Sequence, residues 1–127
     1  MAIDFLDVAD VLHLHADQIT AYGGALGVRD LPLLESAVAQ ARSQFDCEFL
    51  HKSIHEMAAA YLYHIVQNHP FVDGNKRAGA IAALVFLDIN GVEINAPKGA
   101  LFELTMAVAR SEKGKTEIAE WFRQHEQ

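Results

Sequence analysis

The sequence predicts an all-α fold. Apolar residues recur every three to four positions along several stretches, which is the period of an amphipathic helix. No stretch alternates strictly between apolar and polar residues, as a half-buried strand would. The 127 residues, 51% of them hydrophobic, match the size of one ordinary domain with a single core. We therefore expect residues 1–127 to form one compact, single-domain helical bundle.

The first helix is expected close to the N-terminal end. Asp4 is a suitable N-cap, and Gly23 and Gly24 are suitable for ending the helix, because glycine accepts backbone angles that stop helical propagation. The apolar positions between them have helical spacing: Phe5, Val8, Leu12 and Ile19.

The second helix is expected over residues 31–45. Asp30 can cap it, and Pro32 suits a first turn, where its missing N–H removes no helical hydrogen bond. Its apolar face is expected to contain Leu34, Ala37, Val38 and Ala41. Residues 46–52 are then expected to form a loop.

The third helix is expected to start at Ser53, which has the spacing of a capping box with Glu56, and to end before Pro70. Residues 76–90 are apolar on all sides, which predicts a buried helix at the centre of the bundle with Gly91 at its C-terminal end. Two further helices are expected over residues 95–111 and 116–125.

Composition excludes several classes of protein. The formal net charge is −7 and the ten basic residues are scattered, so a direct nucleic-acid surface is not expected. The longest apolar run, Ala78–Leu87, is too short to span a bilayer. The single cysteine, Cys47, cannot form an internal disulfide, which fits a reducing compartment. We expect a soluble cytoplasmic protein without membrane contact.

The seven histidines do not have the spacing of a metal site. His51 and His55 are four residues apart, but no third ligand is close in sequence. The remaining helix-associated histidines are expected to be ordinary half-buried residues: His13, His15 and His64.

One stretch, HPFVDGNKRAG at 69–79, carries far more polar chemistry than a connection between helices needs. It leads into the N-terminus of the central helix, where free backbone N–H groups and the helix dipole favour an anion. Lys76 and Arg77 would oppose that dipole unless a phosphate offset their charge. Asp73 suits Mg²⁺, and His69 could accept a proton from an attacking hydroxyl. The alternative is a solvated turn with a capping histidine.

HPFVDGNKR resembles the signature of the Fic/Doc family, H-x-F-x-[D/E]-G-N-[G/K]-R. YGGALGVRDLPLLESAV and LVFLDINGV resemble its death-on-curing (Doc) branch, so the resemblance covers essentially the whole chain and implies a Fic-like helical bundle. It also implies ATP as co-substrate and Mg²⁺ as cofactor. The roles implied are a general base for His69, a core anchor for Phe71, a Mg²⁺ ligand for Asp73, a phosphate nest for Gly74 and Asn75, and phosphate-binding cations for Lys76 and Arg77.

Two departures distinguish the sequence from the nucleotidyl-transferring Fic branch. That branch has Gly in place of Lys76 and a second Arg in place of Ala80. Both replacements are typical of Doc-like members, in which the ATP γ-phosphate is transferred. The first prediction is therefore a protein kinase that modifies a hydroxyl of a target protein, and the alternatives are protein adenylylation or a non-catalytic phosphate-binding or partner-binding module.

The Doc resemblance also implies a biological setting. Such members are toxins of type II toxin–antitoxin systems, and they are associated with translation elongation GTPases as targets. The sequence contains no inhibitory segment of the Fic type, so control by a separate antitoxin is expected. Its helix would cover the active-site cleft.

Overall fold

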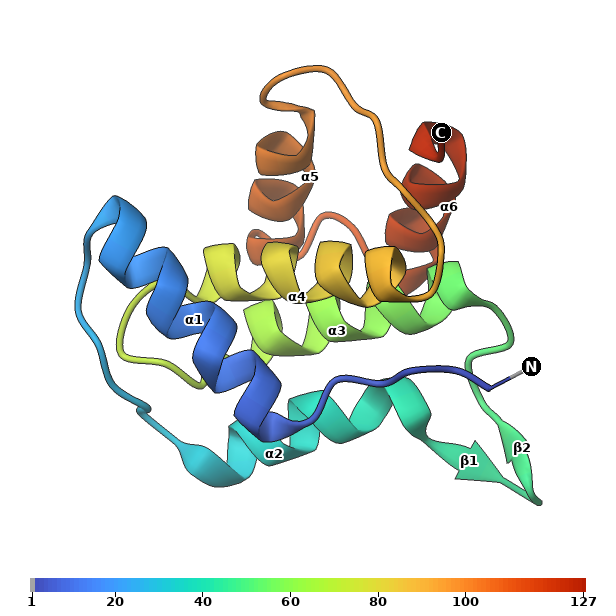
Figure 1. The fold of residues 1–127 in the computed structure, drawn as a ribbon, viewed down its shortest axis with the longest axis horizontal. Helices are drawn as coiled ribbons and strands as arrows, with labels where there is room; N and C mark the ends of the chain where they lie inside the picture. Colours follow the sequence, from blue (N-terminus) through green and yellow to red (C-terminus); the bar gives the residue numbers. More distant parts are fainter. Residues whose placement is uncertain (1) are drawn as a thin grey trace.

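The computed structural model describes residues 2–127 and confirms the all-α prediction. The described chain forms the helices α1 (Val8–Tyr22), α2 (Leu31–Ala39), α3 (Ile54–Asn68), α4 (Asn75–Ile89), α5 (Ala100–Ala109) and α6 (Lys115–His125), a 3-10 turn (Gln40–Arg42) and a hairpin of β1 (Gln44–Phe45) and β2 (Glu48–Phe49). Helices α3 and α4 lie side by side at the centre, and α5 and α6 stand across them (Figure 1). Helix α3 contacts α2, α4, α5 and α6, so it is the axis of the bundle.

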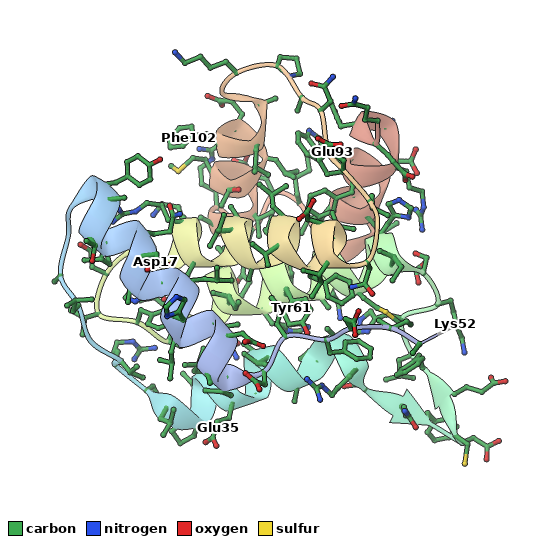
Figure 2. The ribbon with its side chains drawn as sticks, in the orientation of Figure 1. Asp17, Glu35, Lys52, Tyr61, Glu93 and Phe102 are labelled. Carbon is green, nitrogen blue, oxygen red and sulfur yellow. The ribbon has the colours of Figure 1, made fainter. Side chains whose placement is uncertain are left out.

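The core lies around α3 and α4 and contains fully buried Phe71, Phe86 and Phe122. Tyr61 is also fully buried, at the centre of the molecule (Figure 2). Its hydroxyl accepts a hydrogen bond from the Leu6 N–H at 2.9 Å and donates one to the Leu6 carbonyl at 3.1 Å. These two bonds attach the segment before α1 to the core.

The prediction of an Asp4 cap was wrong. The N-cap of α1 is Asp7, which forms a reciprocal capping box with Asp10: each carboxylate accepts from the backbone N–H of the other residue, three positions away. The capping box at α3 is only half formed: Ser53 accepts from the Glu56 N–H, but the Glu56 carboxylate accepts from the Lys52 N–H. Asp30 caps α2 as predicted.

The region after α2 also differs from the prediction. Helix α2 ends at Ala39, and the predicted loop contains the turn and second strand of the β1–β2 hairpin. Asp46 and Cys47 form its turn with positive φ angles of 53° and 63°, the conformation that a tight two-residue hairpin requires. Strands of two residues are too short to produce a periodic sequence pattern.

Helix α4 is less enclosed than its apolar sequence predicted. Ile81, Leu84 and Val85 are only half-buried, and Ile81 and Leu84 line a groove that α4 shares with α5. Gly91, with φ 84°, follows the C-cap Asn90, as expected for the end of this helix. Within residues 2–127, no helix is both long and apolar enough to cross a membrane.

The close packing of α3 and α4 depends on Gly79. A Cβ atom at this position would lie 2.9 Å from Val66 Cγ2 and 3.1 Å from the Leu62 carbonyl oxygen. The side chain of Val66 could adjust, but the backbone of α3 could move only with the whole helix. Gly79 therefore determines how close the two central helices come.

Gly79→Ala should lower the free energy of unfolding by about 1–3 kcal/mol because of this overpacking. The sign is diagnostic, since Gly→Ala inside an exposed helix normally stabilises by about 1 kcal/mol. Urea denaturation measures the effect. Gly114→Ala is the control: its new Cβ would meet only Glu117 Oε2, at 3.5 Å, so we expect a change of about 1 kcal/mol or less. A more stable Gly79→Ala variant would contradict the packing argument.

A cluster of basic side chains joins α3 to α6. Lys115 Nζ lies 3.2 Å from His64 Nε2 and 3.4 Å from His51 Nε2. Burial, together with the nearby Lys115 ammonium, lowers the pKa of His64 from 6.5 to about 4. His64 is thus half-buried, as expected, and is neutral at pH 7.

This low pKa of His64 predicts acid sensitivity. Between pH 6.5 and about 4, the unfolded chain binds a proton at His64 and the folded protein does not, so the free energy of unfolding should fall as pH falls through this window. Thermal melts of the wild type and of His64→Gln, measured from pH 7 to 4, test this. The variant should lose less Tm over that range, and parallel curves for the two proteins would refute the assignment.

Candidate active site

The predicted functional stretch forms the corner between α3 and α4. His69 follows the last residue of α3, and Gly74 is the N-cap of α4. Asn75, Lys76 and Arg77 form the first turn of α4. No side chain of the described residues caps this helix, so its first N–H groups remain available to an anion.

His69 is the first residue of this corner. It caps α3 in the left-handed conformation, with φ 51° and ψ 52°, which non-glycine residues rarely adopt. The side chain is exposed and lines a groove that α4 and α5 share. Its ring makes no hydrogen bond to any residue in the described part of the chain, so both ring nitrogens are accessible to a ligand.

The Asn75 side chain connects the loop to the first turn of α4. Its side chain is 4% exposed; Oδ1 accepts from the Phe71 N–H at 2.8 Å, and Nδ2 donates to the Phe71 carbonyl at 3.0 Å. The Phe71 side chain is fully buried. Because the amide of Asn75 is used within the loop, this residue can offer an anion only its backbone N–H.

His15 on α1 belongs to this site, and the expectation that it is an ordinary half-buried residue was wrong. It is 3% exposed, and its ring stacks on that of Phe71 with 3.8 Å between centroids. Its Nε2 donates to the Asp73 carbonyl at 2.7 Å, which requires the proton on Nε2 because a carbonyl only accepts. The sequence does contain a signal: His15 is four residues from both Val11 and Ile19 on the buried face of α1.

Asp73 holds its carboxylate at the surface between two backbone donors. Oδ2 accepts from the Ala25 N–H at 3.1 Å and Oδ1 from the Gly74 N–H at 2.8 Å. These hydrogen bonds, with the nearby Arg77 charge, lower the pKa of the Asp73 carboxyl below its usual value. The group is therefore ionised at neutral pH, and each oxygen retains a lone pair for a cation.

The two cations of the corner have different surroundings. The Arg77 guanidinium donates from Nη1 to the Gly23 carbonyl at 2.9 Å and to the Gln18 carbonyl at 3.4 Å, so it is attached to the end of α1. Lys76 is exposed and forms no ion pair with the described residues. Lys76 can move toward a ligand, whereas Arg77 has a defined position.

A groove of about 510 Å³ extends from the corner along α4 and α5. One end is polar and contains His69 and Asp73–Arg77. The other end is apolar and is lined by Ala80, Ile81, Leu84, Leu101, Phe102 and Met106. Phe102 is 63% exposed and projects from α5 on the side away from α6 (Figure 2). The structure thus brings all the predicted polar residues to one end of a single groove.

A central α-helix that begins within HPFVDGNKR, at Asn75, and has no side-chain cap among the described residues defines a helical domain of the Fic-like class. Residues 5–87 match the family model of the Fic/DOC family. The chain is 41% identical over 93 residues to Toxin Doc of Mycolicibacterium smegmatis, covering 73% of this chain and 69% of that protein. It is 30% identical over 115 residues to Protein kinase doc of Escherichia phage P1, covering 90% and 89%. The chain belongs to the Fic/DOC family.

Proposed function

We propose that this protein is a Doc-type toxin that transfers the γ-phosphate of ATP to a hydroxyl of a target protein. The observation that carries the proposal is the exposed His69 ring, without a hydrogen-bond partner in the described chain, at the polar end of a groove that also contains Asp73, Lys76 and Arg77. The names of the two relatives, Toxin Doc and Protein kinase doc, support it.

The N-terminal turn of α4 would hold the ATP phosphates. Its free N–H groups and dipole favour negative charge, and Gly74 starts the helix with φ 77°, a conformation that glycine adopts without strain. Lys76 and Arg77 would neutralise charge on the transferred group. The energetic cost of placing two cations at a helix N-terminus is thereby offset by the ligand.

Asp73 is suited to the role of a Mg²⁺ ligand. Its carboxylate is exposed, ionised and oriented by two N–H donors, and Mg²⁺ typically binds through one or two carboxylates together with substrate phosphates and water. Across residues 2–127 no group of three or more His, Cys, Asp or Glu side chains forms a metal cage. Mg²⁺ held by Asp73 would supply positive charge that offsets the negative charge of the ATP phosphates.

His69 would act as the general base. The target hydroxyl oxygen forms a bond to the γ-phosphorus while the bond from that phosphorus to the β–γ bridging oxygen breaks. The hydroxyl proton moves to the imidazole of His69, and ADP leaves. Because the ring accepts no hydrogen bond from the described chain, a lone pair is available for that proton.

Two residues support γ-phosphate transfer over AMP transfer. Lys76 is a flexible point charge that can follow a terminal phosphate. Ala80 lines the groove with a methyl group where the nucleotidyl-transferring branch has a second Arg, so the guanidinium fork of that branch is missing from this position. ATP would therefore present its γ-phosphate to His69.

The apolar end of the groove supports the proposal that an antitoxin, the partner expected for a toxin of this type, binds there. Leu84, Leu101 and the 63%-exposed Phe102 form an apolar surface beside the catalytic corner. An antitoxin helix would bury anchors there at helical spacing. The proposed target class, by the Doc resemblance, is a translation elongation GTPase.

Labelled ATP tests the reaction. With target extract, label should enter protein from γ-labelled and not from α-labelled ATP, because the phosphorus closest to His69 is expected to be the terminal one. His69→Ala should reduce incorporation by about 100-fold or more through loss of the base. Its stability should change by less than about 1 kcal/mol, since the side chain is exposed.

His13→Ala is the matched control: the expectation that His13 is half-buried was wrong, because its side chain on α1 is 78% accessible. This variant should keep wild-type incorporation. Label from the α position would favour adenylylation. Label from neither position would favour a non-catalytic binding module.

The metal assignment has its own test. In Asp73→Asn the amide oxygen can still accept one of the two backbone N–H bonds, but the charge that attracts the cation is lost. Calorimetry should show that Mg²⁺ tightens ATP binding to the wild type and not to the variant. Asp17→Asn, at an exposed carboxylate on α1, removes the same charge outside the groove and should behave as wild type. An unchanged Mg²⁺ effect in Asp73→Asn would exclude Asp73 as the ligand.

A further inference from the structure

The connection between α1 and α2 contributes an arginine to the end of α3. Arg29 Nε donates to the His69 carbonyl at 2.7 Å, and Nη2 donates to the Asn68 carbonyl at 3.0 Å. Carbonyls at a helix C-terminus have no partner within the helix, and a cation there is favoured by the helix dipole. The guanidinium of Arg29 thus satisfies two carbonyls, one of them that of His69.

The backbone around Arg29 holds the following residues of the loop. The N–H groups of Arg29 and Asp30 both donate to the Pro70 carbonyl, at 2.7 and 3.0 Å. The Val72 N–H donates to the Gly27 carbonyl at 3.0 Å, and Val28 pairs with Phe71 in an antiparallel bridge. Residues 27–30, which we call the splint, therefore lie antiparallel to the start of the signature loop.

The splint acts where the backbone is strained. His69 has a φ of 51°, a left-handed conformation that is unfavourable for a non-glycine residue and that persists only when neighbouring contacts impose it. The sign of φ determines the direction in which the Cβ atom leaves the backbone. Holding the carbonyls on both sides of His69 therefore also determines where its ring lies relative to the groove.

We infer that Arg29 is a positioning residue for His69: its guanidinium keeps the peptide groups at Asn68 and His69 in the orientation that directs the imidazole into the groove. This inference rests on the proposed function for its effect on catalysis. Arg29 does not line the groove, so it acts on the reaction only through His69. Small displacements of a catalytic base are sufficient to slow a reaction strongly.

Arg29→Gln tests the role against a matched control, Arg42→Gln. Arg42 also reaches a remote backbone carbonyl, that of Leu6 at 2.9 Å, but it lies outside the groove. Arg29→Gln should lower the kcat of phosphate transfer by about 10-fold to 100-fold, with the KM for ATP within about two-fold of wild type. Arg42→Gln should leave both constants unchanged. Arg29→Lys, which can donate to one carbonyl at a time, should recover part of kcat.

A measurement without substrate separates this inference from the proposed function. The ¹³Cα and ¹³Cβ chemical shifts of His69 report its backbone angles, and those of Arg29→Gln should move away from the left-handed values while those of Arg42→Gln should not. If the wild type transfers no phosphate, the proposed function fails and this comparison alone decides the inference. Unchanged His69 shifts in Arg29→Gln, an unchanged kcat, or an equal loss of kcat in Arg42→Gln would overturn it.

Discussion

The hydrogen bonds between the Asn75 side chain and the Phe71 backbone are the constraint on which the site depends. They lie in the core, where leaving either partner unpaired would cost about 1–3 kcal/mol. Because Asn75 is in the first turn of α4 and Phe71 is in the loop, these bonds give the loop a defined position on the helix N-terminus. The buried Phe71 ring then attaches both to the core.

Helix α1 and the connection after it complete the corner from outside. His15 holds the Asp73 carbonyl, and Ala25 holds the Asp73 carboxylate. The fit explains the second glycine of the YGG stretch: a Cβ at Gly24 would lie 2.7 Å from Asp73 Oδ2 and 2.9 Å from Arg77 Nη2, and its φ is 120°. A side chain at this position would displace the carboxylate and the guanidinium together.

The charge distribution separates the site from the rest of the surface. The chain has a net charge of −7, yet its two adjacent cations, Lys76 and Arg77, lie at the positive end of the α4 dipole. Cations at the positive end of a helix dipole are repelled by it in the free protein, and an anionic ligand would relieve that repulsion. The local electrostatic strain therefore favours ligands that carry several negative charges, such as a nucleoside triphosphate.

Local rules were sufficient for much of the fold and for the polar corner. Helical spacing and one apolar stretch predicted all six α-helices found within residues 2–127, although the predicted ranges 31–45 and 95–111 extend beyond α2 and α5. Asp30 and Ser53 were correctly predicted as caps, and the ordered residues from His69 to Arg77 marked the corner as the candidate site. These features depend on neighbours within a few positions along the chain, which is the range over which helix period, capping and helix dipole act.

The tertiary structure alone decided what supports that corner. His15 contacts a residue 58 positions away, and Arg29 contacts one 40 positions away. The four-residue spacing on α1 indicates that His15 is buried but not which residue it contacts, and the Arg29 contact leaves no periodic pattern, because both contacts depend on how α1 and its connection pack against the α3–α4 corner. The apolar residues that α5 contributes to the groove, and the half-burial of α4, also depend on how the helices pack. The sequence by itself determined which chemical groups are present, and packing decided which of them meet, since contacts between distant segments follow from the arrangement of whole helices.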